Sequence, residues 1–111
     1  MKNLKDKSCV VCEDKNIKPL PKEKVDRMLA ELKGWAVAKN NKSISKELVF
    51  KNFDKAMDFV NLVADIAELE GHHPDIHICY NKVEFVLYTH SVRGLTENDF
   101  ILASKIDGIH I

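Results

Sequence analysis

Apolar residues recur with a helical period in two segments of the chain. Between Pro21 and Gly34 they recur at i, i+3, i+4 and i+7, and residues 53–70 carry a longer stripe that ends before Gly71. Proline suits a first helical turn and glycine is the usual stop, so both segments are predicted to be amphipathic helices. The apolar positions are Val25, Met28, Leu29 and Leu32 in the first segment and Ala56, Phe59, Val60, Val63, Ile66 and Ala67 in the second.

A third helix is predicted to begin after Thr96. Thr96 and Asp99 have the spacing of a capping box, with Asp in place of the usual Glu. An apolar stripe follows at Ile101, Leu102 and Ile106, which indicates that this helix also buries one face.

Other segments alternate apolar and polar residues, as half-buried strands do. These segments are 35–37, 43–50, 76–81 and 83–90. Asn40-Asn41 and Asn81-Lys82 suit the turns of two hairpins, and His90 is expected to end the last strand. The order of elements is therefore helix, hairpin, helix, hairpin, helix.

This order predicts an α+β fold, in which a four-stranded antiparallel sheet has three helices packed on one face. The other face of the sheet then needs cover, and strand edges near Phe50 or Val83 would be unprotected. Self-association is one way to cover both, so we expect a homo-oligomer.

Residues 1–20 are rich in Lys and Asp, contain Pro19 and lack a sustained apolar period, which predicts a loosely ordered arm before a single domain at 21–111. Cys9 and Cys12 in this arm have the spacing of half a zinc site, but no second pair follows at finger spacing. We therefore expect no metal, and two reduced thiols that pack the arm against the domain.

Composition narrows the class of protein further. The chain has 111 residues, 17 basic and 17 acidic, so no overall field favours nucleic acid or an anionic membrane. No apolar run approaches the length of a membrane span and no signal peptide is recognisable, so a cytoplasmic protein is expected. An odd number of cysteines, three, argues against a disulfide framework.

Histidines and carboxylates cluster near the predicted element ends, where they could meet at one rim. They are Glu68, His72, His73, His90 and Asp99. Imidazole can give or take a proton at neutral pH, so such a rim could be a proton-transfer site.

Simpler readings of these residues stay open. His72 and His73 could cap helix carbonyls, His90 could be a polar strand end, and Asp99 could serve only the Thr96 amide. A zinc site of the three histidines is the other chemical option, although adjacent histidines on one loop seldom point at one ion.

The residues that carry most information form a longer pattern. It consists of Glu68-Leu-Glu-Gly-His72-His73-Pro74, Tyr80-Asn81-Lys82-Val83, Thr89-His90 and Gly94-Leu95-Thr96-Glu97-Asn98-Asp99. This pattern resembles the signature of the pterin-4a-carbinolamine dehydratases, and the resemblance extends over most of the chain. It implies an enzyme that removes water from 4a-hydroxytetrahydropterin to give quinonoid dihydropterin, in recycling of the pterin used by an aromatic amino acid hydroxylase. It also implies a homodimer or homotetramer that needs no cofactor.

The resemblance further implies roles for individual residues. His72 and His90 would be the acid and the base, in either order, His73 would bind the pterin, and Asp99 would orient a site histidine. The catalytic set is thus His72, His73, His90 and Asp99, and the substrate-binding set is Glu68, Gly71, His72, His73, Tyr88, Thr89, His90 and Ser91.

Three positions depart from the animal members of the family. Ile76 replaces a Trp, Asn98 replaces an Arg and Gly71 replaces an acidic residue, which is typical of a bacterial-type member and leaves the pterin side chain open. Two other functions remain: a non-catalytic pterin-binding or protein-interaction module of the dimerisation or coactivator type, and a role in molybdopterin metabolism.

Overall fold

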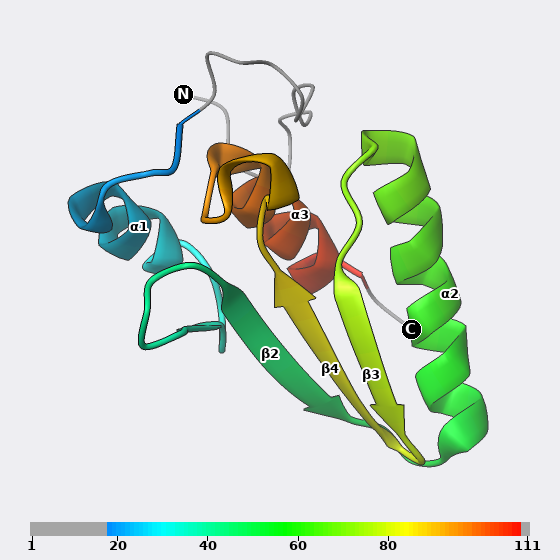
Figure 1. Cartoon of the computed structure of the whole chain (residues 1–111). Coiled ribbons are helices and arrows are strands. Elements are labelled where there is room, and N and C mark those ends of the chain that lie inside the picture. Colours follow the sequence, from blue (N-terminus) through cyan, green and yellow to red (C-terminus); the bar gives the residue numbers. More distant parts are fainter. Residues whose placement is uncertain (1–17, 110–111) are drawn as a thin grey trace.

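A computed structural model describes residues 18–109, which form helices and strands in the predicted sequence order (Figure 1). The elements are α1 (Lys22–Leu29), β1 (Ala36–Val37), β2 (Ile44–Val49), α2 (Phe53–Glu70), β3 (Asp75–Cys79), β4 (Lys82–Leu87), the 3-10 helix η2 (His90–Val92) and α3 (Glu97–Asp107). The α+β class with three α-helices and a four-stranded antiparallel sheet is confirmed.

The predicted arm lies almost wholly outside the described residues, and so do Cys9 and Cys12. Its last part is described at residues 18–20, where the Leu20 amide donates to the Leu95 carbonyl at 2.7 Å. The boundary between arm and domain at residue 20 stays a prediction.

The strands lie in the order β1-β2-β4-β3, and all neighbours are antiparallel. The two hairpins are joined through β2 and β4, whose register runs from Ile44 opposite Leu87 to Val49 opposite Lys82. The edges of the sheet are therefore β1 and β3. The expectation of unprotected edges near Phe50 or Val83 was wrong, because Val83 lies in a central strand and the Phe50 amide donates to the Asn81 carbonyl.

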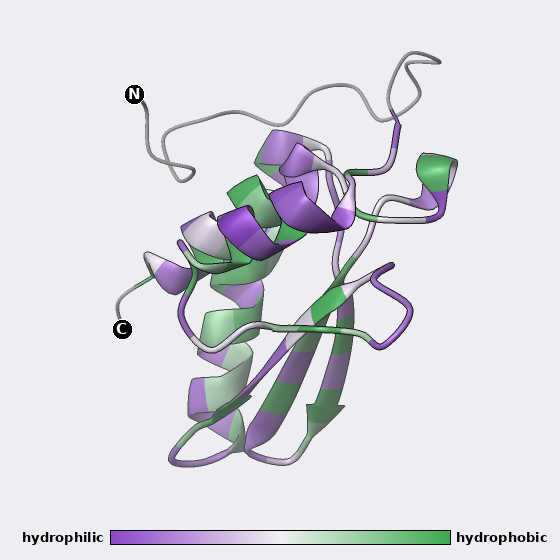
Figure 2. Cartoon of the chain, turned by 90° about the vertical axis from the view of Figure 1, so that its left-hand side faces the viewer, coloured by the Kyte–Doolittle hydropathy of each residue, from purple (hydrophilic) through white to green (hydrophobic). Residues whose placement is uncertain are grey.

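One face of the sheet builds the core. Val83, Phe85 and Leu87 are fully buried, and Phe85 packs against Phe59 of α2 with ring centroids 5.8 Å apart. The opposite face is polar: Glu47, Glu84 and His77 lie in one row across β2, β4 and β3. Figure 2 shows the resulting alternation as bands of green and purple along the strands.

The long helix α2 has the bounds that its sequence predicts. The Asn52 side chain accepts from the Lys55 amide at 2.9 Å and begins the helix, and Gly71 ends it with a left-handed backbone at φ 67°. Helix α1 ends at Leu29 rather than near Gly34, because i to i+3 bonds from Glu31 and Leu32 tighten the chain into turns.

Strand β4 ends earlier than predicted, and His90 does not end it. The ladders stop at the pairs Ile44–Leu87 and Asp75–Val86, so beyond Leu87 neither neighbouring strand offers a partner. The chain instead closes on itself through the Thr89 amide, which donates to the Gly94 carbonyl at 2.8 Å, and His90 begins η2 inside this loop. Likewise, β3 ends at Cys79, and the turn falls on Tyr80-Asn81 rather than Asn81-Lys82.

Candidate functional site

The first turn of α3 positions the carboxylate on which the candidate site is built. Thr96 is the N-cap, and Asp99 Oδ2 accepts from the Thr96 amide at 2.9 Å, which confirms the predicted capping box. This contact satisfies one of the amides that a helix start leaves without an intrahelical partner. Asp99 therefore does cap the start of α3, but this role uses only one oxygen of its carboxylate, Oδ2.

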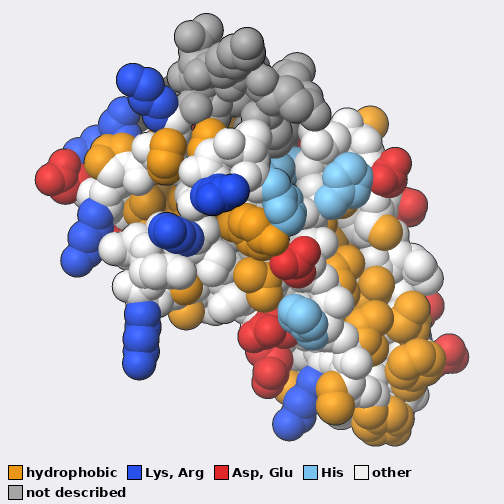
Figure 3. All heavy atoms as spheres, viewed as in Figure 1, with side chains coloured by type: hydrophobic (Ala, Val, Ile, Leu, Met, Phe, Trp, Pro, Cys, Tyr) orange, Lys and Arg blue, Asp and Glu red, His pale blue; other side chains and the backbone are white. Residues whose placement is uncertain are grey.

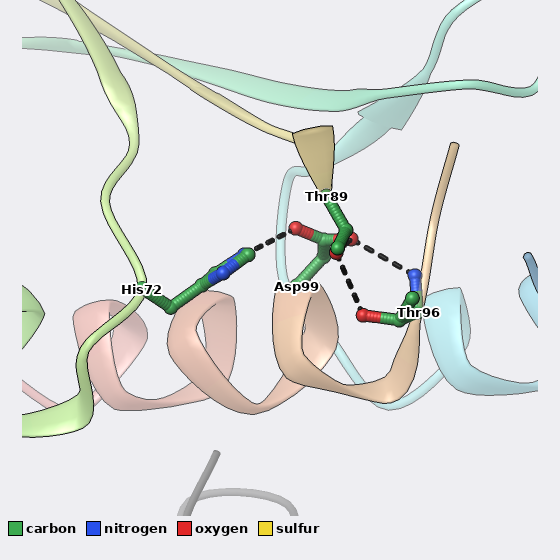
Figure 4. A network of polar contacts seen from close by, with 4 residues as sticks. All are labelled: His72, Thr89, Thr96 and Asp99. Atoms are coloured by element: carbon green, nitrogen blue, oxygen red, sulfur yellow. Dashed lines mark hydrogen bonds and ion pairs between the residues drawn. The ribbon is translucent and has the colours of Figure 1, made fainter. Parts of the chain in front are cut away.

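The other oxygen of Asp99 holds a histidine from a distant part of the chain. His72 Nε2 lies 2.6 Å from Asp99 Oδ1, and the Thr89 hydroxyl donates to Oδ2 at 2.9 Å (Figure 4). Thr89 and Thr96 also join their hydroxyls at 2.7 Å. One carboxylate thus ties together the end of α2, the loop after β4 and the start of α3.

Burial makes this cluster rigid. Asp99 and Thr89 are fully buried and His72 is 5% exposed. A buried carboxylate is stable only when hydrogen bonds replace its lost hydration, and Asp99 accepts three. Within residues 18–109 no buried side-chain polar atom lacks a partner. The cluster therefore fixes the orientation of the His72 ring.

His73 is exposed to solvent, unlike the buried His72 beside it in the chain. Its Nε2 lies 2.7 Å from Glu68 Oε1 on the last turn of α2, with side chains 61% and 78% exposed. An exposed pair of this kind contributes little to stability. It leaves both groups accessible to a ligand in solution.

His90 is exposed and lies beside an aromatic ring. Its ring centroid is 4.2 Å from that of Tyr88, with the planes tilted by 49°. The two residues line a cleft of about 380 Å³, together with Lys42, Ser43 and Arg93. This volume is within the range of small-molecule sites.

The remaining predicted site residues fall near these groups in different ways. Gly71 precedes His72, and Ser91 is exposed within η2. Thr89, predicted to bind substrate, turns its hydroxyl inward to Asp99, and its backbone amide and carbonyl form hydrogen bonds with Gly94 inside the loop. Since Thr89 and His72 share the Asp99 carboxylate, and His90 follows Thr89, the two histidine segments lie close together. Convergence of the ring nitrogens on one substrate stays a prediction.

The sequence did not predict the two positively charged residues that line the cleft, Lys42 and Arg93. Lys42 and Ser43 directly precede β2, and Arg93 directly follows η2 in the loop between β4 and α3. Only the pairing of β2 with β4 brings these segments together, and no periodicity in the sequence indicated that pairing.

Metal binding and membrane insertion find no support in the part of the chain that is described. Among residues 18–109, no group of three or more His, Cys, Asp or Glu side chains is arranged to hold a metal ion. None of the helices in that range combines the length and apolar character that a bilayer span requires.

The fold and the site define a small α+β protein with a carboxylate-held histidine and accessible histidines at one end of a single sheet. The family model described as pterin 4 alpha carbinolamine dehydratase matches residues 18–109. The chain therefore belongs to this family of hydro-lyases, which confirms the family and the class of enzyme predicted from the sequence.

Individual relatives agree with this assignment. A Halorhodospira halophila relative that bears the family's name is 39% identical over 96% of this chain and 97% of its own length. The Arabidopsis thaliana protein named pterin-4-alpha-carbinolamine dehydratase 2, mitochondrial, is 40% identical, and the chain spans only 60% of its length. A Brucella melitensis crystal structure, described as a transcriptional coactivator/pterin dehydratase, is similar with a TM-score of 0.78 and 33% identity over 82% of this chain and 97% of that one.

Proposed function

We propose that this protein removes water from 4a-hydroxytetrahydropterin to give quinonoid dihydropterin, as a step that recycles tetrahydrobiopterin after an aromatic amino acid hydroxylase has used it. Membership of the dehydratase family supports the type of reaction. The observation that carries the chemistry is the buried contact of 2.6 Å between His72 and Asp99, beside a loop that holds an exposed His90.

The reaction needs one acid and one base. The C4a–O bond breaks as the leaving hydroxyl receives a proton, and a ring nitrogen of the pterin loses one, so water and the quinonoid product form without any redox change. His72 and His90 are the groups proposed for these two transfers. Asp99 acts as a positioning residue, because it accepts from other donors through Oδ2 and so presents Oδ1 as an acceptor for His72 Nε2–H.

The neighbouring groups suit substrate binding. His73 and Glu68 form an accessible donor and acceptor pair at the end of α2. The Tyr88 and His90 rings offer aromatic surface at the cleft. Together with the backbone at Gly71 and Ser91, they are proposed to hold the polar edge of the pterin.

A direct assay tests this proposal. The 4a-hydroxytetrahydropterin is generated in place by a hydroxylase, and its absorbance decay is followed with wild type, His72→Ala and His90→Ala. We expect wild type to accelerate the decay, and each variant to lose about a hundredfold, as for removal of an acid or base. His77→Ala is the matched control, since His77 is exposed on β3 away from the cleft residues, and it should keep full activity. If His72→Ala and His90→Ala were as active as His77→Ala, the proposed acid and base roles of His72 and His90 would be wrong.

We further propose a cytoplasmic homodimer or homotetramer. Strand β3 is an edge with unpaired backbone groups, and large apolar side chains are exposed nearby at Ile78 and Tyr80. Light scattering that finds only a monomer at micromolar concentration would contradict the oligomer.

A protein-interaction role is the second candidate. The Brucella relative's description includes transcriptional coactivator, and Leu69 on α2 is 83% exposed here. The two functions are separable because His72→Ala and His90→Ala should abolish only the dehydratase.

A further inference from the structure

The cleft beside His90 has an unusual concentration of positive charge. Within residues 18–109 it is lined by Lys42, Ser43, Tyr88, His90 and Arg93, and none of these five is acidic. The whole chain has a formal net charge of zero, so two cations around one cleft are a local feature. Figure 3 shows Lys and Arg side chains (blue) next to histidine (pale blue) on the face turned to the viewer.

The two cations have no carboxylate to neutralise them within residues 18–109. The lysines with an ion pair there are Lys46, with Asp107, and Lys105, with Glu70, whereas Lys42 and Arg93 have none. Each of the five described lining residues also carries a side-chain hydrogen-bond donor, which for Ser43 and Tyr88 is a hydroxyl group. The cleft is thus matched to an acceptor with several oxygens and negative charge.

Arg93 also has a backbone conformation that is costly for an arginine. It is left-handed, with φ 51° and ψ 45°, a region that glycine adopts freely and that other residues rarely occupy. A large side chain at such a position suggests a use for that side chain.

From this geometry we propose that the cleft binds a phosphate ester on the side chain of the pterin, so that the preferred substrate is a phosphorylated pterin. The proposal rests on the proposed function, because Tyr88 and His90 belong both to the pterin site and to the cleft. Arg93 offers the planar fork that pairs with two phosphate oxygens, and Lys42 adds a point charge. A neutral side chain would leave these charges solvated and gain little from them.

The test compares two stable ligands, 7,8-dihydroneopterin and its 3′-phosphate, by calorimetric titration into the full chain. We expect the phosphate ester to bind roughly tenfold more tightly at low ionic strength, with the advantage shrinking as salt is added. The double substitution Lys42→Gln with Arg93→Gly should abolish the difference and leave the affinity for the unphosphorylated ligand unchanged. Glycine at position 93 suits the left-handed backbone, so this variant should remain folded.

The control removes two cations elsewhere. Lys51→Gln with Lys55→Gln alters a separate cleft, formed with Phe50 and Asp58, and should keep the tenfold preference. Equal affinity of wild type for both ligands, or a preference that survives in the Lys42 and Arg93 variant, would overturn the phosphate proposal alone. Failure of both ligands to bind would instead overturn the pterin site itself, and the phosphate proposal with it.

Discussion

Replacing Asp99 separates the two tasks that its carboxylate performs. Asp99→Ala removes the acceptor from His72 Nε2 and from the Thr96 amide, and both residues are buried. Each buried donor left without a partner costs about 1–3 kcal/mol, so the loss of two partners should lower the free energy of unfolding by about 2–6 kcal/mol. The Thr89 hydroxyl keeps Thr96 Oγ1 as a partner and adds little to this loss. A drop of this size is a large part of the roughly 5–15 kcal/mol that stabilises a domain.

Asp99→Asn keeps the shape and tests the chemistry. The amide oxygen can still accept from the Thr96 and Thr89 donors, so stability should fall by only about 1–2 kcal/mol. Its NH₂ group then faces His72 Nε2, which must become an acceptor, and the ring hydrogen moves to Nδ1. We expect kcat/KM to fall on the order of a hundredfold in a protein that remains folded.

Urea unfolding gives the stability of both variants, and the decay of 4a-hydroxytetrahydropterin gives their activity. Asp54→Asn is the matched control, because Asp54 is an exposed acid in the first turn of α2. It should change stability by less than about 0.5 kcal/mol and leave activity unchanged. A folded Asp99→Asn protein with wild-type kcat/KM would refute the positioning role, and an Asp99→Ala protein within about 1 kcal/mol of wild type would refute the energetic argument.

Two further substitutions test how the scaffold is held. Asp107→Ala should lower the free energy of unfolding by about 1–2 kcal/mol, because the Asp107 carboxylate accepts from Trp35 Nε1 and from Lys46 Nζ, each at 2.9 Å. It should leave kcat/KM unchanged, because Asp107 lies at the far end of α3 from the site. Asp107→Asn keeps an acceptor oxygen, so an equal loss of stability in that variant would contradict this explanation. Gly71→Ala should cost about 1–2 kcal/mol in thermal or urea unfolding, because its backbone is left-handed while the added methyl group meets nothing within 4 Å. Gly108→Ala, at φ −82°, should be nearly neutral by the same measurement.

The sequence predicted most reliably those features that depend on a short stretch of chain. The bounds of α2 followed from its apolar stripe and Gly71, and the capping box followed from the spacing of Thr96 and Asp99. Both are local, since each depends on residues within one or a few helical turns.

Features that depend on distant pairs were predicted poorly from the residues themselves. The end of β4 was placed at His90, because alternation continues past Leu87 and nothing in the sequence shows where the partner strands stop. The contact between His72 and Asp99 spans 27 positions, and only the resemblance to a family suggested that an acid would orient a site histidine. The role of Arg93 in the cleft was not predicted, because Lys42, which lines the cleft with it, lies about fifty residues earlier in the chain, just before β2.

The shared carboxylate has a consequence for how the protein loses activity. Because Asp99 lies in the first turn of α3 and also holds His72, fraying of that turn releases the histidine at the same moment. Local opening of this kind needs less free energy than global unfolding. Activity should therefore be lost on heating before the sheet melts, and amide hydrogen exchange at Asp99 should report the same event.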